Sequence, residues 1–274
     1  MPNHVQNIVV ISGRDEDVNR LIKEVKYSPD THDAETAGPD TNTLDFNKVV
    51  PMPRLLNASN YGYCVELIGA YASYVNPKYF GIDDAIEGVR PTKLDKEVFK
   101  QIEEFVKENY LAKDKDCTRL TSEQLKNLAN NITMSAGHLC EAEKEKEYTA
   151  KDIIGMGAQL WTAKLLYGTY DWYNWCCAHW GTKWNSYRHE KGEPNQIIFQ
   201  TAWSTPMPVI KKLSELYPDT TIETYYADED IGNNCGKYTY RPGKLIEDWC
   251  PGDEEAEKYA NDVWNLAIEA YSWY

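Results

Sequence analysis

Apolar residues recur at two different periods along the chain, and the two periods separate a β-rich frame from a helical middle. Short segments rich in β-branched and aromatic residues, bounded by Gly, Pro or polar turns, are typical of strands. The frame contains five such segments, at 5–12, 44–50, 196–203, 221–227 and 236–241. Pro51 and Pro53 end the second segment, because proline cannot donate to a strand ladder.

Helical spacing of apolar residues predicts the helices of the frame. In 15–25 the residues Val18, Leu21, Ile22 and Val25 fall on one face. The stretch 207–217 follows Pro206 and holds Pro208 near its start, where a missing N–H costs nothing, and 254–271 forms a terminal helix. Two strand–helix–strand units therefore flank the middle of the chain.

This order of elements predicts an α+β fold of the ferredoxin-like type, in which two strand–helix–strand units share one antiparallel sheet. Right-handed crossovers would place the first and third strands, 5–12 and 196–203, at the centre of the sheet, with both helices on one face. We expect a C-terminal helix in addition.

The middle of the chain changes character at residue 55. Helical patterns cover it almost throughout, at 63–75, 96–110, 122–131, 136–147 and 150–166. We therefore expect a split ferredoxin-like domain made of 1–54 and 167–274, with 55–166 as a large helical insertion.

An aromatic segment at 170–185 holds four of the nine tryptophans. Trp172, Trp175, Cys176 and His179 share one helical face, and Tyr173, Cys177, Trp180 and Trp184 continue a second face. Such a segment is expected to be buried on several sides, as a plug between the sheet and whatever covers it. Gly181 is expected to end the helix in a left-handed conformation.

The charge balance narrows the possible partners. The net charge is −14, from 43 acidic and 29 basic residues, which argues against non-specific nucleic-acid binding because that binding requires a basic surface. An acidic chain is compatible with a basic protein partner. No segment has the length of a membrane span or the pattern of a secretory signal, and we read the seven scattered cysteines as reduced thiols. We therefore expect a cytoplasmic protein without a membrane association.

Several residues bear on cofactor chemistry, and none forms a complete motif. Cys176, Cys177 and His179 lack the paired spacing of zinc sites, so we expect buried thiols and no metal. Cys177 with His179 or His189 lacks the signature of a thiol enzyme. Gly155 and Gly157 follow no strand, which excludes a dinucleotide loop, and the cysteine spacing fits no iron–sulfur cluster. We expect no cofactor, and the sequence indicates no enzymatic activity.

Aromatic and basic residues mix at 180–191. Such a mixture can stack on a base and neutralise a phosphate, as in proteins that bind a nucleotide or an RNA end. The alternative interpretation is a solvated loop that follows a core helix. The residues of this candidate ligand site are Trp180, Lys183, Trp184, Tyr187 and Arg188.

Four separate motifs resemble a known family. The opening Met-Pro-Asn-His, residues 44–53 (LDFNKVVPMP), 180–185 (WGTKWN) and 199–208 (FQTAWSTPMP) are similar to the Api92-like, YubB ferredoxin-like domain proteins of phages, plasmids and genomic islands. The resemblance covers about 1–53 and 170–241. It implies a ferredoxin-like domain and a mobile-element origin, and it implies no catalytic residue and no established activity.

These observations lead to one main hypothesis and two alternatives. We expect a non-enzymatic accessory protein that inhibits a host defence system, of the anti-CRISPR or anti-restriction type, by presenting an acidic surface to a host nuclease or complex in the bacterial cytoplasm. The charged helix 96–110 of the insertion is expected to bind this partner through Glu103, Glu104 and Glu108. The alternatives are a nucleotide or RNA-end binding protein that uses the 180–188 segment, and a phage structural or assembly component.

Overall fold

The computed structural model describes residues 2–29, 37–38, 40–56 and 150–266, together with the single positions 64, 67, 68 and 71. The chain divides into two compact units, one formed by Met1–Met52 and Tyr173–Tyr274 and the other by Pro53–Trp172. The first unit holds the sheet, and the second falls on nearly the same stretch as the predicted helical insertion.

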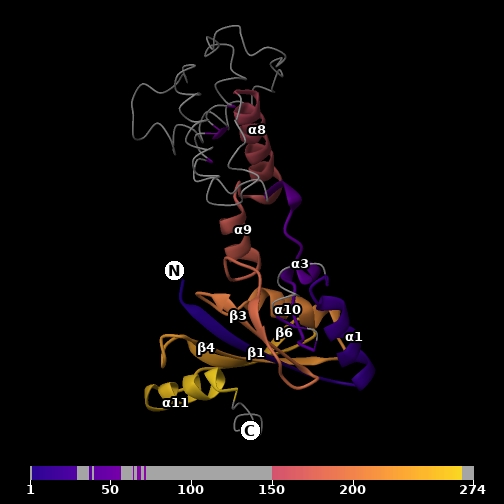
Figure 1. Ribbon diagram of the computed structural model, residues 1–274, viewed down its shortest axis with the longest axis vertical. Helices are drawn as coiled ribbons and strands as arrows, with labels where there is room; N and C mark the ends of the chain where they lie inside the picture. The colour runs from indigo at the N-terminus through magenta and orange to yellow at the C-terminus, as the bar shows by residue number, and fades with distance from the viewer. Residues whose placement is uncertain are drawn as a thin grey trace. The chain divides into compact units, whose positions relative to one another are not determined.

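The first unit is built on a six-stranded sheet in which every neighbouring pair of strands is antiparallel (Figure 1). The order across the sheet is β2-β3-β1-β4-β5-β6. The strands are β1 (His4–Ser12), β2 (Tyr187–Glu190), β3 (Gln196–Ala202), β4 (Thr221–Asp228), β5 (Cys235–Arg241) and β6 (Lys244–Trp249).

Strand β1 lies in the middle of the sheet, between β3 and β4. Both neighbours run antiparallel to β1 and therefore parallel to each other, and helix α10 (Met207–Leu216) connects them. This arrangement is the split β-α-β unit of ferredoxin-like folds. The predicted α+β class and the pairing of 5–12 with 196–203 are confirmed.

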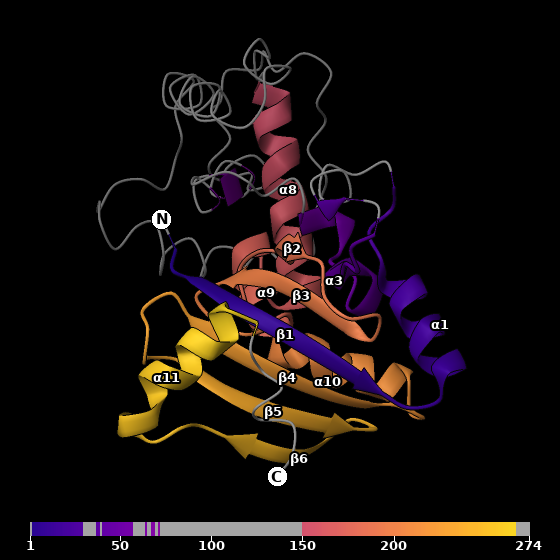
Figure 2. The same ribbon diagram turned by 60° about the horizontal axis from the view of Figure 1, so that its bottom comes forward.

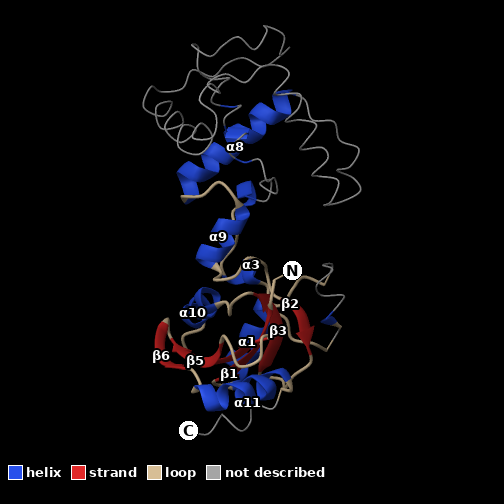
Figure 3. Cartoon of the chain, turned by 90° about the vertical axis from the view of Figure 1, so that its left-hand side faces the viewer, coloured by secondary structure: helices blue, strands red, loops and turns tan. Residues whose placement is uncertain are grey.

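Helices cover both faces of the sheet (Figures 2 and 3). Helix α10 lies on one face and α11 (Asp253–Trp264) on the other. Because successive strand residues point to opposite faces, Ile8, Tyr225 and Cys235 point toward α11 and pack against Tyr259 and neighbouring residues of that helix. Helix α1 (Asp15–Val25) lies beside α10, as predicted for the two crossover helices.

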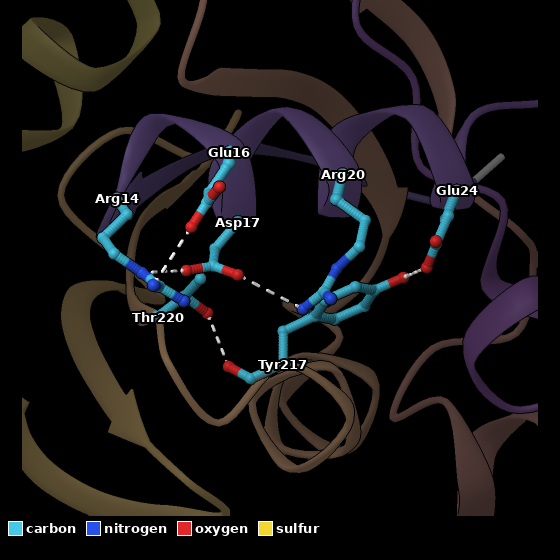
Figure 4. Close-up of polar contacts among 7 residues, drawn as sticks. All are labelled: Arg14, Glu16, Asp17, Arg20, Glu24, Tyr217 and Thr220. Carbon is cyan, nitrogen blue, oxygen red and sulfur yellow. Dashed lines mark hydrogen bonds and ion pairs between the residues drawn. The ribbon is translucent and has the colours of Figure 1, made fainter.

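Polar contacts join α1 to the end of α10 (Figure 4). The hydroxyl of Tyr217 donates to a carboxylate oxygen of Glu24 at 2.6 Å, and the guanidinium of Arg20 lies 5.8 Å from the centre of the Tyr217 ring. The buried carboxylate of Asp17 lies between Arg20, at 3.4 Å, and Arg14, at 2.7 Å. The ends of the two helices are therefore held together by charged groups as well as by apolar packing.

The predicted strand at 44–50 is wrong, because this segment forms the short helix α3 (Phe46–Val49). In a ferredoxin-like sheet the second strand would pair with the edge of β3 that faces away from β1. Strand β2 pairs with that edge here. Local hydrogen bonds favour the helical turn instead, since Asp45 accepts from the N–H of Asn47 at 3.0 Å. The N–H of Phe46 donates to the side-chain oxygen of Asn185 at 2.8 Å.

The aromatic segment forms helix α9 (Trp172–His179). Trp175 and Cys176 are buried, and Gly181 follows at φ +80°, which confirms the predicted left-handed turn after the helix. Tyr173, Cys177 and Trp184 of the second face and His179 of the first are exposed, whereas Trp180 of the second face is buried. The prediction that the segment is buried on several sides is therefore wrong for these four exposed residues.

The second unit contains helix α8 (Ala150–Tyr167) and the short helix η1 (Arg54–Leu56). A Cβ atom at Gly157 would lie 2.0 Å from the carbonyl oxygen of Leu67, so only glycine permits this close approach. The predicted helices at 96–110, 122–131 and 136–147 lie outside the described residues.

Candidate functional site

A polar and aromatic surface forms where β2 meets β3 and the start of β1. Tyr187 is paired with Gln200, and Gln200 with Gln6, so the three side chains project from one face of the sheet. We call this the β2 surface. It brings Lys183, Trp184, Tyr187 and Arg188 together with His4, Gln6, Glu190 and Gln200.

Tyr187 is the centre of the β2 surface. Its hydroxyl oxygen lies 2.8 Å from Nδ1 of His4, and its ring meets the Trp184 ring edge to face at 6.1 Å. Burial, opposed by the guanidinium of Arg188 and assisted by the carboxylate of Glu229, raises the pKa of Tyr187 to about 12. The hydroxyl is therefore neutral at physiological pH and can donate a hydrogen bond.

Trp184 and Lys183 form a cation–π pair at the rim of the β2 surface. The ammonium nitrogen of Lys183 lies 4.0 Å from the centre of a Trp184 ring, and Trp184 is 40% exposed. Attraction to the ring quadrupole holds the ammonium close to the indole. A planar group that reaches this rim would therefore meet an aromatic ring and a positive charge together.

Arg188 is positioned by an irregularity in β2. The pairing register shifts between Tyr187 and Glu190, and Arg188 has φ +48°. Such a bulge re-aims a side chain at a sheet edge. The guanidinium is exposed and donates to the side-chain oxygen of Gln200 at 3.2 Å.

Gln6 forms the buried floor of the β2 surface. Its amide nitrogen donates to a carboxylate oxygen of Glu190 at 3.1 Å, while its amide oxygen has no hydrogen-bond partner among the described residues. The sequence predicted no binding role for His4, Gln6, Glu190 or Gln200. Their part in the surface depends on strand register across a separation of more than 180 residues, and no local pattern carries that information.

Trp180 differs from the other four predicted ligand residues, because it is only 3% exposed. Its indole N–H donates to the carbonyl oxygen of Val50 at 2.8 Å, and its ring packs against Phe46 and Trp175. Trp180 is a core residue that anchors the 44–50 segment, and it does not belong to the β2 surface.

His189 points into the protein, away from the exposed Arg188. Its Nε2 lies 3.0 Å from the hydroxyl of Ser186 and 3.4 Å from the backbone nitrogen of Leu44. Burial lowers its pKa to about 4. Ser186 is buried and donates to the carbonyl oxygen of Leu44, so this Ser–His pair fastens the 44–50 segment and offers no accessible nucleophile.

The sulfur and imidazole groups of α9 make separate contacts. The Cys176 sulfur lies 3.6 Å from that of Met52. His179 stacks on Trp175 at 4.3 Å and its Nδ1 lies 2.9 Å from the Trp175 carbonyl oxygen. In the part of the chain that the structure describes, no three His, Cys, Asp or Glu side chains are grouped so that they could hold a metal ion.

A second surface is acidic. The outward side of α11 carries the exposed residues Asp253, Glu254, Glu255 and Glu257. A Cβ atom added at Gly232 would lie 3.2 Å from Cγ of Glu257, so the turn after β4, with exposed Glu229 and Asp230, packs beside this helix. The predicted partner residues Glu103, Glu104 and Glu108 lie outside the described residues.

Comparison with known proteins identifies the C-terminal part of the fold. Residues 179–267 match the family model described as the ferredoxin-like domain in Api92-like protein. The chain carries an Api92-like ferredoxin-like domain. The match confirms the family resemblance for the motifs at 180–185 and 199–208, which lie within it. It spans β2 to β6 of the Api92-like domain with helices α10 and α11, and it includes Lys183, Trp184, Tyr187 and Arg188.

A solved structure is also similar to this chain. It is the crystal structure of a protein Api92 from Yersinia pseudotuberculosis, with 13% sequence identity and a TM-score of 0.38 over 92% of this chain and 99% of the other. A search of curated proteins found no significant match. Among the described residues of the Api92-like domain and of the second unit, no helix is both long and apolar enough to cross a bilayer.

Proposed function

We propose that the protein is a non-catalytic accessory protein that acts by binding another protein, and that its partner belongs to a host defence system. The observation that carries the proposal is the presence of exposed Trp184 and Arg188 with Tyr187 at the β2 edge of the sheet. Trp, Tyr and Arg are the residue types that dominate the binding energy of protein interfaces. Tyr187 and Arg188 lie on strand β2, where a paired backbone reduces the entropy lost on binding, and Trp184 lies in the bend just before this strand.

The acidic face of α11 supports a partner with a basic surface. Complementary charge accelerates encounter and suppresses wrong partners. A nuclease that handles nucleic acid is itself basic where it binds its substrate, so an acidic protein can occupy that surface. The resemblance to a mobile-element family supports a host defence complex as the partner.

Affinity capture from lysate of a bacterial host, followed by mass spectrometry, tests the proposal. We expect recovery of a nuclease or other defence protein, with less bound as salt rises because the contacts are electrostatic. Trp184→Ala should reduce capture, and Trp249→Ala, which changes a tryptophan 38% exposed at the opposite edge of the sheet, should not. Failure to capture any defence protein at low salt would refute the proposal.

A nucleotide or an RNA end is the second candidate ligand, favoured by the Lys183–Trp184 pair with exposed Arg188 nearby. A base can stack on the indole while the cations neutralise phosphate. Thermal shift against a nucleotide panel tests this, because a ligand that binds only the folded state raises the melting temperature. An unchanged melting temperature at millimolar nucleotide would exclude this function, and a rise that persists in Trp184→Ala would exclude this site.

A further inference from the structure

Trp203, directly after β3, combines backbone strain with exposure. Its φ is +72°, in the left-handed region that bulky residues rarely adopt, and the side chain is 51% exposed. An indole that is half in solvent contributes little to the core, so packing does not account for keeping it in a strained conformation. Strain of this kind gathers at functional sites, where the surrounding structure fixes it.

Hydrogen bonds fix the Trp203 backbone on both sides. Its N–H donates to the carbonyl oxygen of Asn3 at 3.0 Å, and its carbonyl oxygen accepts from the side-chain amide of Asn234 at 3.0 Å. Asn234 itself has φ +42°, which asparagine tolerates. The backbone that carries the indole is therefore fixed before any partner arrives.

Asp228 is the hub of this arrangement. Its buried carboxylate accepts from the amides of Asn3 at 3.0 Å and Asn234 at 3.1 Å, and from the N–H of Asp230 at 2.9 Å. One side chain thus links the two residues that hold Trp203 to the turn that carries Glu229 and Asp230. The indole and the acidic turn are parts of one preorganised unit.

The carboxylates around Trp203 have no lysine or arginine among the segments that hold them. Glu229 and Asp230 are exposed, and the segments joined by these bonds, 1–5, 201–205 and 228–234, contain no Lys or Arg. Arginine is the side chain that stacks on an aromatic face while its planar N–H groups pair with carboxylates. An exposed indole whose backbone is tied to a turn with exposed acidic side chains is complementary to that group.

We propose that Trp203 is the anchor of a protein interface and receives an arginine side chain from a basic partner, with Glu229 and Asp230 pairing with the same guanidinium. This inference rests on the proposed function, because it takes the partner to be a protein. It adds that the partner binds Trp203 through an arginine side chain. The guanidinium stacks on the indole, and the fixed backbone of Trp203 spares the entropy cost of ordering it.

The first test uses Trp203→Asn, because asparagine accepts the left-handed conformation. We expect the melting temperature to stay the same or rise, while binding of the captured defence protein falls. The matched control is Trp249→Asn: Trp249 meets the Tyr259 ring at 5.3 Å, so its loss should lower the melting temperature and leave binding unchanged. A clear fall in the melting temperature of Trp203→Asn would show a structural residue and overturn the proposal.

The second test needs no natural partner, so its failure is distinguishable from failure of the proposed function. The full chain is labelled with fluorotryptophan, and the ¹⁹F resonance of Trp203 is assigned by its loss in Trp203→Asn. The protein is titrated with short capped glycine peptides that carry two arginines, two lysines or two glutamates, and with a mononucleotide. The resonance of Trp249 serves as the internal control.

We expect the arginine peptide to shift the Trp203 resonance at millimolar concentration, about threefold more tightly than the lysine peptide. Glu229→Gln combined with Asp230→Asn should weaken this response, because the carboxylates that pair with the guanidinium are gone. The proposal is overturned if the Trp203 resonance is unmoved by arginine, moves equally with glutamate, or moves only with the mononucleotide, which would make the site one for nucleic acid.

Discussion

Acidification should destabilise the fold through His189 before the carboxylates begin to titrate. The imidazole lies between the rings of Tyr27 and Phe199, at 5.6 and 6.0 Å, and burial lowers its pKa to about 4. In the unfolded chain the pKa of a histidine is about 6.5. Between these values the unfolded state binds the proton more readily, so stability falls as the pH falls.

The size of the effect follows from the two pKa values. With about 4 in the folded state and about 6.5 in the unfolded state, the linkage relation gives a loss of about 1.2 kcal/mol between pH 7 and about pH 5.5. The loss of stability continues until the pH falls below the pKa of His189 in the folded state. Protonation would place an uncompensated charge beside the Ser186 hydroxyl and the Leu44 N–H, which is the physical origin of the cost.

Urea unfolding at the two pH values measures this loss. The matched variant is His189→Phe, which keeps an aromatic ring in the same space and removes the titrating group. The quantity compared between the two proteins is the change in the free energy of unfolding from pH 7 to about pH 5.5, so a difference in their stability at one pH does not affect the test. We expect the wild type to lose about 1.2 kcal/mol more than the variant. Equal losses in the two proteins would refute the assignment of this pH dependence to His189.

Three further substitutions probe the packing around the Api92-like domain. Tyr217→Phe removes the hydrogen bond to Glu24 and should lower the free energy of unfolding by about 1 kcal/mol in urea titration; no change would show that the pair is fully screened by solvent. Trp175→Ala truncates a buried indole and should cost about 3–5 kcal/mol, seen as loss of the folded circular-dichroism signal; a folded but inactive variant would instead place Trp175 in a binding site. Gly181→Ala forces a Cβ to φ +80°, 2.7 Å from Cδ of Pro208, and should lower stability by about 2 kcal/mol in thermal unfolding, whereas a neutral result would contradict the close packing.

The elements with strong apolar periodicity could be predicted from the sequence. The helix over 15–25 and the strands near 5–12, 196–203, 221–227 and 236–241 were found because one face of each is buried along its length. Strands β2 and β6 were missed because both lie at sheet edges, where exposed side chains such as Lys244 leave no clear alternation. Their existence depends on a paired neighbour, which the local sequence does not encode.

The candidate site could be predicted only in part. Lys183, Trp184 and Arg188 stood out because aromatic and basic residues are adjacent in the sequence, and the structure brings them together on the β2 surface. Trp180 carried the same signal and is buried, because composition does not distinguish the two sides of a turn. The sequence predicted no functional role for Trp203, because the positive φ that marks its strained backbone is seen only in the structure.

The central position of β1 has a consequence for how this protein is made. Asn7 of β1 hydrogen-bonds Thr201 of β3, and 194 positions separate the two residues. On a ribosome the middle strand of the sheet is therefore synthesised long before either neighbour exists, so the sheet can assemble only when the C-terminal third has been translated. Such non-local pairing slows folding, and it leaves an apolar strand unpaired meanwhile. During that interval the insertion and α8 are synthesised, and β1 is open to pairing with other chains until β3 and β4 follow.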